Sequence, residues 1–269
     1  ETHDCFQGQI QTEADLMDEL DWEHVNPATG PLYIEGALPG DVLRVDLLEV
    51  KVLDQSVVCA VPEEGVLGDR ITQMETAVLK HVGGKAVFKD RIEIPLKPMI
   101  GVIGVAPAGG SVANGTPGEH GGNMDCTLIG TGASLYFTVG VEGALFGAGD
   151  LHAVMGDGEI VVTGAETPGE VRLKAQVVQI PGLPTPFLEN EDLVATIASA
   201  ATIDEATKMA TDRMADFLTG IAGLELNDAS MLMSLVGHLK FCQVVDPLMT
   251  VRFEFPKWVL EKYGFALPR

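Results

Sequence analysis

Glycine and proline are spread along the first two-thirds of the chain and interrupt it so often that long helices have little room there. The sequence holds 31 glycines and 15 prolines among its 269 residues. Between them lie short runs rich in Val, Ile and Leu, which we interpret as strands joined by tight turns. The clearest runs are residues 42–52, 100–105, 134–141, 159–164 and 171–180. In the first of them apolar and polar residues largely alternate, which predicts one buried face, as in a sandwich or barrel.

The character of the sequence changes after Pro186. Thr202 and Glu205 form a capping-box pattern ahead of an Ala- and Met-rich stretch, which predicts a helix ending near Gly220. A second helix is expected over residues 228–236.

For this second helix Asn227 is the expected N-cap and Gly237 the expected stop. Strand-like runs at residues 240–245 and 250–255 close the chain. We therefore predict an α+β fold that is predominantly β. It has a β-sandwich-like body over residues 1–185, with a smaller α+β unit over residues 186–269 packed on it.

The charge balance limits the class of partner. The chain carries 39 Asp and Glu against 17 Lys and Arg, for a formal net charge of -22. Such a field repels phosphate backbones and anionic lipid headgroups, so we expect neither nucleic acid nor a membrane surface as partner. No apolar run approaches the roughly 20 residues that cross a bilayer. The four cysteines are widely spaced, as is typical of free thiols in a reducing compartment, and we expect a cytoplasmic protein.

The glycine-rich segment GDLHAVMGDGE at residues 149–159 has the greatest density of chemically active side chains. Its imidazole and carboxylates belong to Asp150, His152, Asp157 and Glu159. If the chain is extended at Asp150 and His152, both side chains lie on one face of a strand. Such a pair can bind a metal ion, or the Asp can orient the His as a base. A polar β-turn with His152 at the surface is the alternative interpretation.

A second glycine-rich segment, GEHGGNMDC at residues 118–126, repeats the theme. Its polar side chains are those of Glu119, His120, Asn123 and Asp125. The paired glycines Gly121 and Gly122 can expose backbone N–H groups, which would stabilise the oxyanion of a tetrahedral intermediate. A phosphate cradle would use a similar loop, but the lysine of a phosphate-binding loop is missing and the surroundings are acidic.

A third segment, DCFQGQI at residues 4–10, raises the question of a cysteine nucleophile like that of the nitrilase-type amidases. Only His3 is basic beside Cys5, which gives little reason for a depressed thiol pKa. Cys126 follows Asp125, whose charge would raise the pKa of that thiol. The signatures of serine amidases and esterases are also missing. We therefore expect a nucleophile other than a cysteine.

The segments at residues 4–10, 118–126 and 149–159, in this chain order and with these spacings, resemble the acetamidase/formamidase family. The resemblance extends through three further blocks: NPATGPLYIEGALPGD (26–41), PMIGVIGVAPAGG (98–110) and MLMSLVGHLKFCQVVDP (231–247). It implies hydrolysis of formamide, acetamide or a similar short amide to the carboxylic acid and ammonia. It also implies a β-rich body with a smaller α+β part, and at least a homodimer. Family members generally carry strands ahead of the first block, where this chain has three residues.

The resemblance assigns functional candidates position by position. In the segments at residues 4–10 and 118–126 they are Asp4, Gln9, His120, Asn123 and Asp125. In the segment at residues 149–159 they are Asp150, His152, Asp157 and Glu159. We expect Gln9, Asp150 and the glycines Gly121 and Gly122 to contact the substrate, with His120 and Asn123 in catalytic roles. Two positions depart from the family pattern: Glu119 replaces an uncharged residue and Met155 a polar one. Both are candidates for tuning substrate choice.

Two mechanisms fit these residues. In the first, Asp4, Asp125 and His152 hold a divalent ion, with Zn²⁺ expected and Ca²⁺ as the alternative, while Glu159 or Asp157 moves protons. In the second no metal takes part: Glu159 is the base that activates water, and the amides of the paired glycines form the oxyanion hole. A surplus of carboxylates and imidazoles without a credible side-chain nucleophile favours the first.

A different functional class is a non-catalytic β-sandwich that binds a small molecule or a carbohydrate, using Ca²⁺ on the same loops. Binding modules of that kind usually display exposed aromatic rings that stack on sugars. This chain is only 6% aromatic, which favours the enzyme. Neither the preferred amide nor the oligomeric state is specified by the sequence.

Overall fold

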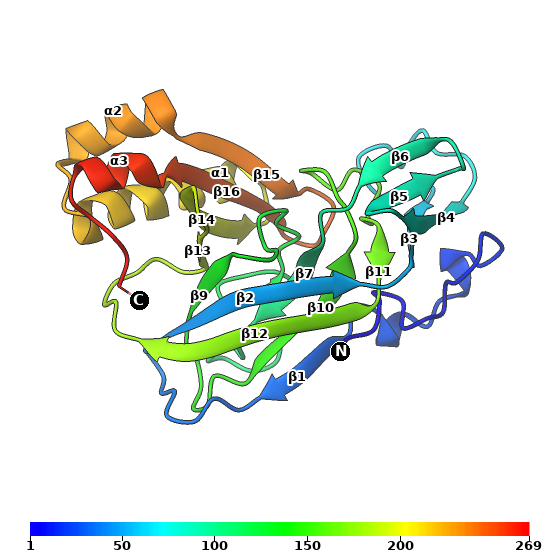
Figure 1. Cartoon of the computed structure of the whole chain (residues 1–269), viewed down its shortest axis with the longest axis horizontal. Helices are drawn as coiled ribbons and strands as arrows, with labels where there is room; N and C mark the ends of the chain where they lie inside the picture. The colour runs from blue at the N-terminus through cyan, green and yellow to red at the C-terminus, as the bar shows by residue number, and fades with distance from the viewer. Residues whose placement is uncertain (269) are drawn as a thin grey trace.

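Two antiparallel sheets packed face to face form the body of the protein, which confirms the predicted predominantly β fold (Figure 1). The computed structural model describes residues 1–268. The first sheet runs in the order β6 (Ile92–Pro95), β5 (Lys85–Phe88), β4 (Glu75–Val82), β3 (Gln55–Ala60), β11 (Glu166–Thr167), β10 (Phe146–His152), β7 (Met99–Gly104) and β8 (Gly121–Asn123), with β1 (Ala28–Leu32) paired to β10. The second runs in the order β12 (Gly169–Val178), β2 (Val42–Val52), β9 (Ser134–Thr138), β13 (Phe187–Glu189), β14 (Leu193–Ala200), β16 (Met249–Pro256) and β15 (His238–Gln243).

The main hydrophobic core lies between the two sheets. Alternate residues of β2, namely Leu43, Val45 and Leu47, are buried in it, as the alternating pattern predicts. They pack in one cluster with Ile103 of β7 and Phe146 of β10 from the other sheet. Burial of these side chains is the main favourable term that holds the sheets together.

Helices cover the outer face of the second sheet. They are α1 (Ile203–Asp216), a π-helical turn over Phe217–Ile221, α2 (Leu226–Val236) and α3 (Lys257–Lys262), while short 3₁₀ turns occupy Met17–Glu19 and Trp22–His24. Figure 1 shows α1, α2 and α3 gathered at the β13 to β16 end of the molecule. The buried face of α1 packs on β14 and β16. In residues 1–268 no helix has the length and apolar character needed to cross a bilayer.

The helix signals in the sequence are mostly confirmed. The Thr202 side chain accepts a hydrogen bond from the Glu205 N–H, as the capping box predicts, and Gly237 ends α2. The prediction that Asn227 caps α2 was wrong, because the helix already includes Leu226 and its N-cap is Glu225.

One other expectation differs from the structure. The strand predicted over residues 159–164 was wrong, because Glu159 and Val162 have φ angles of 47° and 76° and the chain turns there. In addition, β13 pairs with β9, so residues 186–269 extend a sheet that the first part of the chain begins. The predicted division at residue 185 therefore falls within one continuous sheet.

Candidate functional site

Neighbouring strands of the first sheet bring acidic side chains together around one histidine. His152 is the last residue of β10 and lies directly opposite Glu166 of β11. Asp150 precedes it on β10, and Asp125 follows the end of β8. Because β7 lies between β10 and β8, Asp125 and Asp150 approach that strand from its two sides.

The imidazole of His152 is enclosed by three carboxylates. Its Nε2 lies 3.2 Å from Glu166 Oε1, 3.5 Å from Asp150 Oδ1 and 3.7 Å from Asp125 Oδ1. The exposed fraction of these four side chains is 1% to 3%. Glu159, in the loop between β10 and β11, completes the group: single ligand atoms of Asp125, His152 and Glu159 lie within 4.8 Å of one another. We call Asp125, Asp150, His152, Glu159 and Glu166 the acidic cluster.

The acidic cluster has an unusual number of polar atoms without partners. Across residues 1–268, every buried side-chain nitrogen or oxygen that lacks a hydrogen-bond partner belongs to it or to the adjacent Asn123. Both nitrogens of His152 and both carboxylate oxygens of Asp125 are among them. Buried polar groups in native proteins are nearly always paired, because an unpaired one costs about 1–3 kcal/mol. Their concentration at one point therefore indicates a site that binds a polar or cationic ligand.

Burial and mutual repulsion determine the protonation of the cluster. Burial raises the pKa of the Glu159 carboxyl well above its usual range, and Asp125 and Asp150 raise it further. Burial also raises the pKa of Glu166. For His152, burial lowers the pKa, but the Glu166 and Asp150 carboxylates outweigh that effect and raise it overall. A bound cation would reverse these effects, because it favours carboxylates and a neutral imidazole.

The second sheet contributes one further carboxylate. Asp246, in the loop between β15 and β16, accepts a hydrogen bond of 3.0 Å from the Asn123 side chain. Burial and the charge of Glu159 raise its pKa to about 8. The Gln243 side chain holds this loop in place by accepting the N–H groups of Val245 and Asp246.

The backbone of the acidic cluster is strained at three of its five members. Asp125, Asp150 and Glu159 have φ angles of 44°, 55° and 47°, in the left-handed region that side chains other than glycine adopt rarely. Such strain persists only where the surrounding structure enforces it, and it gathers at functional sites. Gly101 of β7 supports this arrangement. A Cβ atom there would lie 2.5 Å from Asp125 Oδ1 and 2.7 Å from Asp150 Oδ2.

Two residues of the site had no usable signal in the sequence. Glu166 stands alone between small residues, and only its register opposite His152 reveals that it is buried in the cluster. Asp246 has the sequence context of a turn residue, and only the packing of the second sheet brings it to Asn123.

Asp157, a predicted proton shuttle, has a different environment. Its carboxylate accepts hydrogen bonds of 2.9 and 2.7 Å from Arg252 and one of 2.6 Å from the Thr127 hydroxyl. The Arg252 side chain is buried in β16, so this pair ties the loop that carries Glu159 to the second sheet. Asp157 therefore has the contacts of an anchor.

Asp4 and Gln9, predicted as a metal ligand and a substrate contact, lie outside the acidic cluster. The buried Asp4 carboxylate accepts the N–H groups of Phe6 at 2.9 Å and Gly8 at 3.1 Å, which are the bonds of a local turn. Asp4 and Glu166 both line a cavity of about 280 Å³. The exposed Gln9 accepts a hydrogen bond from the Asp21 N–H.

The thiols of Cys5 and Cys126 differ in the direction in which the protein shifts their pKa. Cys5 is buried beside the acidic cluster, and burial together with Glu166 and Asp150 raises its pKa, which agrees with the expectation that it is no free nucleophile. The expectation that Asp125 raises the pKa of Cys126 was wrong. Burial raises that pKa, but the Cys242 thiol and the Arg252 guanidinium outweigh burial and lower it. Cys126 is wholly enclosed in the core.

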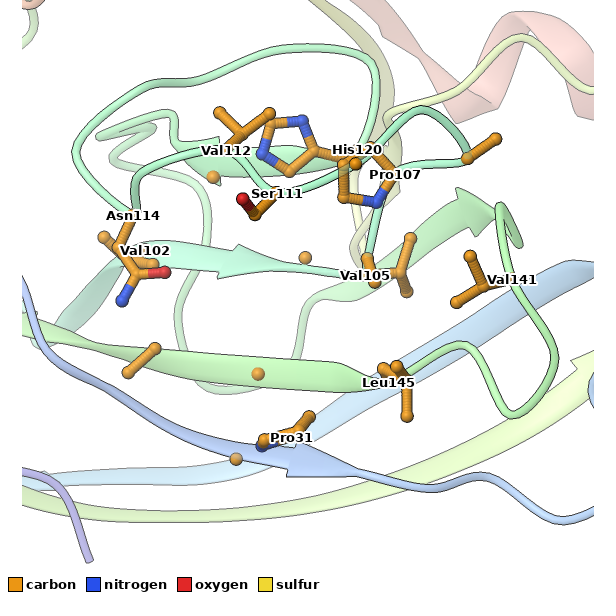
Figure 2. A pocket seen from close by; sticks show the side chains of 18 of the residues that line it. Pro31, Val102, Val105, Pro107, Ser111, Val112, Asn114, His120, Val141 and Leu145 are labelled. Carbon is orange, nitrogen blue, oxygen red and sulfur yellow. The ribbon is translucent and has the colours of Figure 1, made fainter.

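A large pocket is lined by residues outside the acidic cluster. It has a volume of about 780 Å³, and His120 and Gly122 line it while no member of the cluster does. Figure 2 shows His120 and Val112 on one side of this pocket and Leu145 and Pro31 on the other.

Gly121 and Glu119, two further residues singled out in the sequence, make contacts with residues outside the acidic cluster. The Gly121 N–H donates to the Gly118 carbonyl at 3.1 Å, so one of the two amides expected in an oxyanion hole already has a partner. Glu119, which departs from the family pattern, is exposed and pairs with Arg213 of α1.

The anchoring contact of Asp157 can be tested by Asp157→Asn, which keeps the shape of the side chain and removes its charge. We expect a loss of about 1–2 kcal/mol in the free energy of unfolding, moderate because the side chain is 37% exposed. The Asp157 pKa lies below its ordinary value of 3.8, since the bonds from Arg252 and Thr127 outweigh burial. The stabilisation is therefore complete above about pH 3.8 and is lost as pH falls through the folded-state pKa.

Urea denaturation of both proteins at neutral pH and in acid measures this difference. A variant as stable as the parent that loses most of its turnover number would show that Asp157 transfers protons and is no anchor.

The space at Gly101 can be tested by Gly101→Ala. Because the added methyl group would collide with two carboxylates, we expect a loss of about 100-fold in turnover, the effect of a displacement near 1 Å at reacting groups. Gly109→Ala is the matched control, since a Cβ atom there meets nothing within 4 Å. Steady-state kinetics of both variants would decide, and equal activities would contradict the role of Gly101.

The sequence and the fold of this chain match those of known proteins. The sequence profile of the Acetamidase/Formamidase family matches residues 1–114 and 109–247. The crystal structure of an acetamidase from Bacillus halodurans is 45% identical, covers 98% of this chain and 90% of its own, and superposes with a TM-score of 0.96. That of a predicted acetamidase/formamidase from Thermoanaerobacter tengcongensis is 46% identical, with coverages of 99% and 89% and a TM-score of 0.95.

Curated relatives are more distant in sequence. A formamidase from Methylophilus methylotrophus is 25% identical over 77% of this chain and 68% of its own length. An acetamidase from Mycolicibacterium smegmatis is 26% identical over 59% of this chain, and the chain spans 55% of that relative. The length of the family match, together with a buried site built from its characteristic segments, shows that this chain belongs to the acetamidase/formamidase family.

Proposed function

We propose that this protein is an amidohydrolase that cleaves a short aliphatic amide, formamide or acetamide, to the carboxylic acid and ammonia. The observation that carries the proposal is the acidic cluster with its unpaired polar atoms, in a chain whose named relatives are acetamidases and formamidases. Hydrolysis of an amide needs an activated water, stabilisation of the oxyanion and protonation of the departing nitrogen.

The residues present fit a divalent cation. Asp125, His152 and Glu159 can each offer one ligand atom at one point, and their donor atoms lack other partners. Two carboxylates and one imidazole suit Zn²⁺, whereas Ca²⁺ takes oxygen ligands. Glu159 thus replaces Asp4 in the ligand set, because the Asp4 carboxylate is engaged in its own turn. When bound, such an ion lowers the pKa of water to about 7 and polarises a carbonyl group.

Other residues of the chain supply orientation and proton transfer. The Asn123 Oδ1 is a buried acceptor without a partner, and it can receive a hydrogen bond from the –NH₂ group of an amide. Asp246 is partly exposed and lies against Asn123, so it can exchange protons between solvent and the departing nitrogen. Glu166 and Asp150 lie 3.2 and 3.5 Å from His152 Nε2, so their negative charge adds to the attraction of this place for a cation.

A small apolar cavity next to Glu159 suits the acyl group of the substrate. It has a volume of about 320 Å³, and among its lining residues are Glu159, Val154, Met155 and Ile160. Apolar walls favour a short alkyl chain over a charged one. We therefore propose that the amide enters through this cavity.

The competing proposals have less support. A metal-free mechanism loses one of its two oxyanion donors, because the Gly121 N–H is already bonded to Gly118. A non-catalytic binding module is not favoured, since the relatives of this chain are named as enzymes. Association into a homodimer or a larger homo-oligomer, and residence in the cytoplasm, stay predictions from the sequence.

The proposed reaction can be measured as ammonia release from formamide, acetamide and propionamide. We expect release from at least one of them, its loss on removal of divalent ions with a chelator, and its recovery on addition of Zn²⁺. His152→Ala should lower turnover at least about 100-fold, because it removes one proposed ligand and the centre of the cluster. Cys59→Ser, at a buried thiol outside the cluster, is the control and should keep full activity.

Two results would contradict parts of this proposal separately. Full activity in a protein shown to be metal-free would exclude the metal, and no ammonia from any of the three amides would exclude the substrate class.

The assignment of the small cavity can be tested by Met155→Ala, which enlarges it. We expect the ratio of kcat/KM for butyramide to that for acetamide to rise about 10-fold, the value of one or two methylene groups in an apolar pocket. Val112→Ala is the matched control, since Val112 lines the 780 Å³ pocket. A change of preference in the control and none in Met155→Ala would place the acyl group in the larger pocket.

A further inference from the structure

Two members of the acidic cluster and the neighbouring Cys5 form a second set of ligand atoms that the proposed ion does not use. One ligand atom each from Cys5, Asp150 and Glu166 lies within 4.8 Å of the other two. This set shares no residue with Asp125, His152 and Glu159. The chain therefore offers two separate groups of three ligands in one buried region.

The second set points to a ligand by more than its composition. Asp150 Oδ1 and Glu166 Oε2 are buried atoms without hydrogen-bond partners, on side chains that are only 3% exposed. The Cys5 thiol donates a hydrogen bond of 2.7 Å to the Asn26 Oδ1. If the thiol gave up its proton, the Asn26 amide could turn and donate from its nitrogen to the sulfur.

The charges of the acidic cluster favour a second cation. Its four carboxylates carry four negative charges when ionised, and a single divalent ion offsets two of them. The remaining two must either take up protons or stay buried without compensation, at a cost of several kcal/mol per ion. A second divalent ion offsets them, and a Cys5 thiolate would add one further negative charge beside it.

Ligand atoms of the two sets also lie as close together as those of neighbouring metal ions. His152 Nε2, from the first set, lies 3.2 Å from Glu166 and 3.5 Å from Asp150 of the second. In hydrolytic two-metal centres the ions lie about 3.5–4 Å apart, and ligands of adjacent ions are in contact. A thiolate ligand favours Zn²⁺ or another transition metal over Ca²⁺ and Mg²⁺.

We propose that Cys5, Asp150 and Glu166 bind a second divalent transition-metal ion beside the one held by Asp125, His152 and Glu159. This inference rests on the proposed function, in that it takes the first ion as present. It assigns to Cys5 the role of a metal ligand in place of a nucleophile.

Co²⁺ tests this, because a thiolate bound to it gives a charge-transfer band in the near ultraviolet, separate from the visible ligand-field bands. The metal-free full-length protein is titrated with Co²⁺ alone, followed by absorption spectroscopy and by calorimetry. We expect two ions per chain and the charge-transfer band. Cys5→Ser should lose the band and one ion while keeping the visible bands of the first site. Glu166→Gln should lower the affinity for the second ion about 10- to 100-fold.

Cys59→Ser is the matched control and should keep both ions and the band. The wild-type spectrum decides even if Cys5→Ser fails to fold, because a single ion without the band overturns the inference. That result would leave hydrolysis at the first ion intact. Two ions with the band, in a protein that releases no ammonia from any short amide, would instead support the second ion and overturn the proposed function.

Discussion

The burial of several carboxylates around one imidazole is the constraint on which the rest of the structure depends. Asp125, Asp150 and Glu166 lie within 3.7 Å of the His152 ring, out of contact with solvent. Carboxylates in such a place repel one another and are poorly hydrated, which makes the unliganded cluster unfavourable. Its position between strands of one sheet keeps it together, because the strand ladders and the surrounding core stabilise the fold by far more than the cluster costs.

Two anchors outside the cluster connect it to the second sheet. The bidentate pair of Arg252 with Asp157 fixes the loop that carries Glu159, and the Gln243 side chain fixes the loop that carries Asp246. Both contacts set where a carboxylate is placed, which is how residues far from the reacting atoms can control a site.

Two cavities of different size are candidates for the substrate. The pocket of about 780 Å³ is far larger than formamide or acetamide, whereas Glu159 borders an apolar cavity of about 320 Å³. A prediction of the site from pocket volume alone would therefore choose the pocket of about 780 Å³, which no member of the acidic cluster lines. The unpaired buried atoms point toward the cluster, and chemistry depends on such atoms more than on volume.

The sequence by itself determined the strand and turn pattern of the body, the capped helix α1, and two segments that hold Asp125, Asp150, His152 and Glu159. These features are local, because alternation, capping and glycine punctuation act between residues close in the chain. Strand β14 was not predicted, because both of its faces are buried and its sequence therefore does not alternate between apolar and polar residues. Only the tertiary structure places Glu166 and Cys5 beside these residues, and it engages Asp4 in a local turn and Asp157 in an ion pair with Arg252. The contacts of Glu166, Cys5 and Asp157 follow from strand register and sheet packing, which bring distant parts of the chain together and leave no mark on the spacing of either segment.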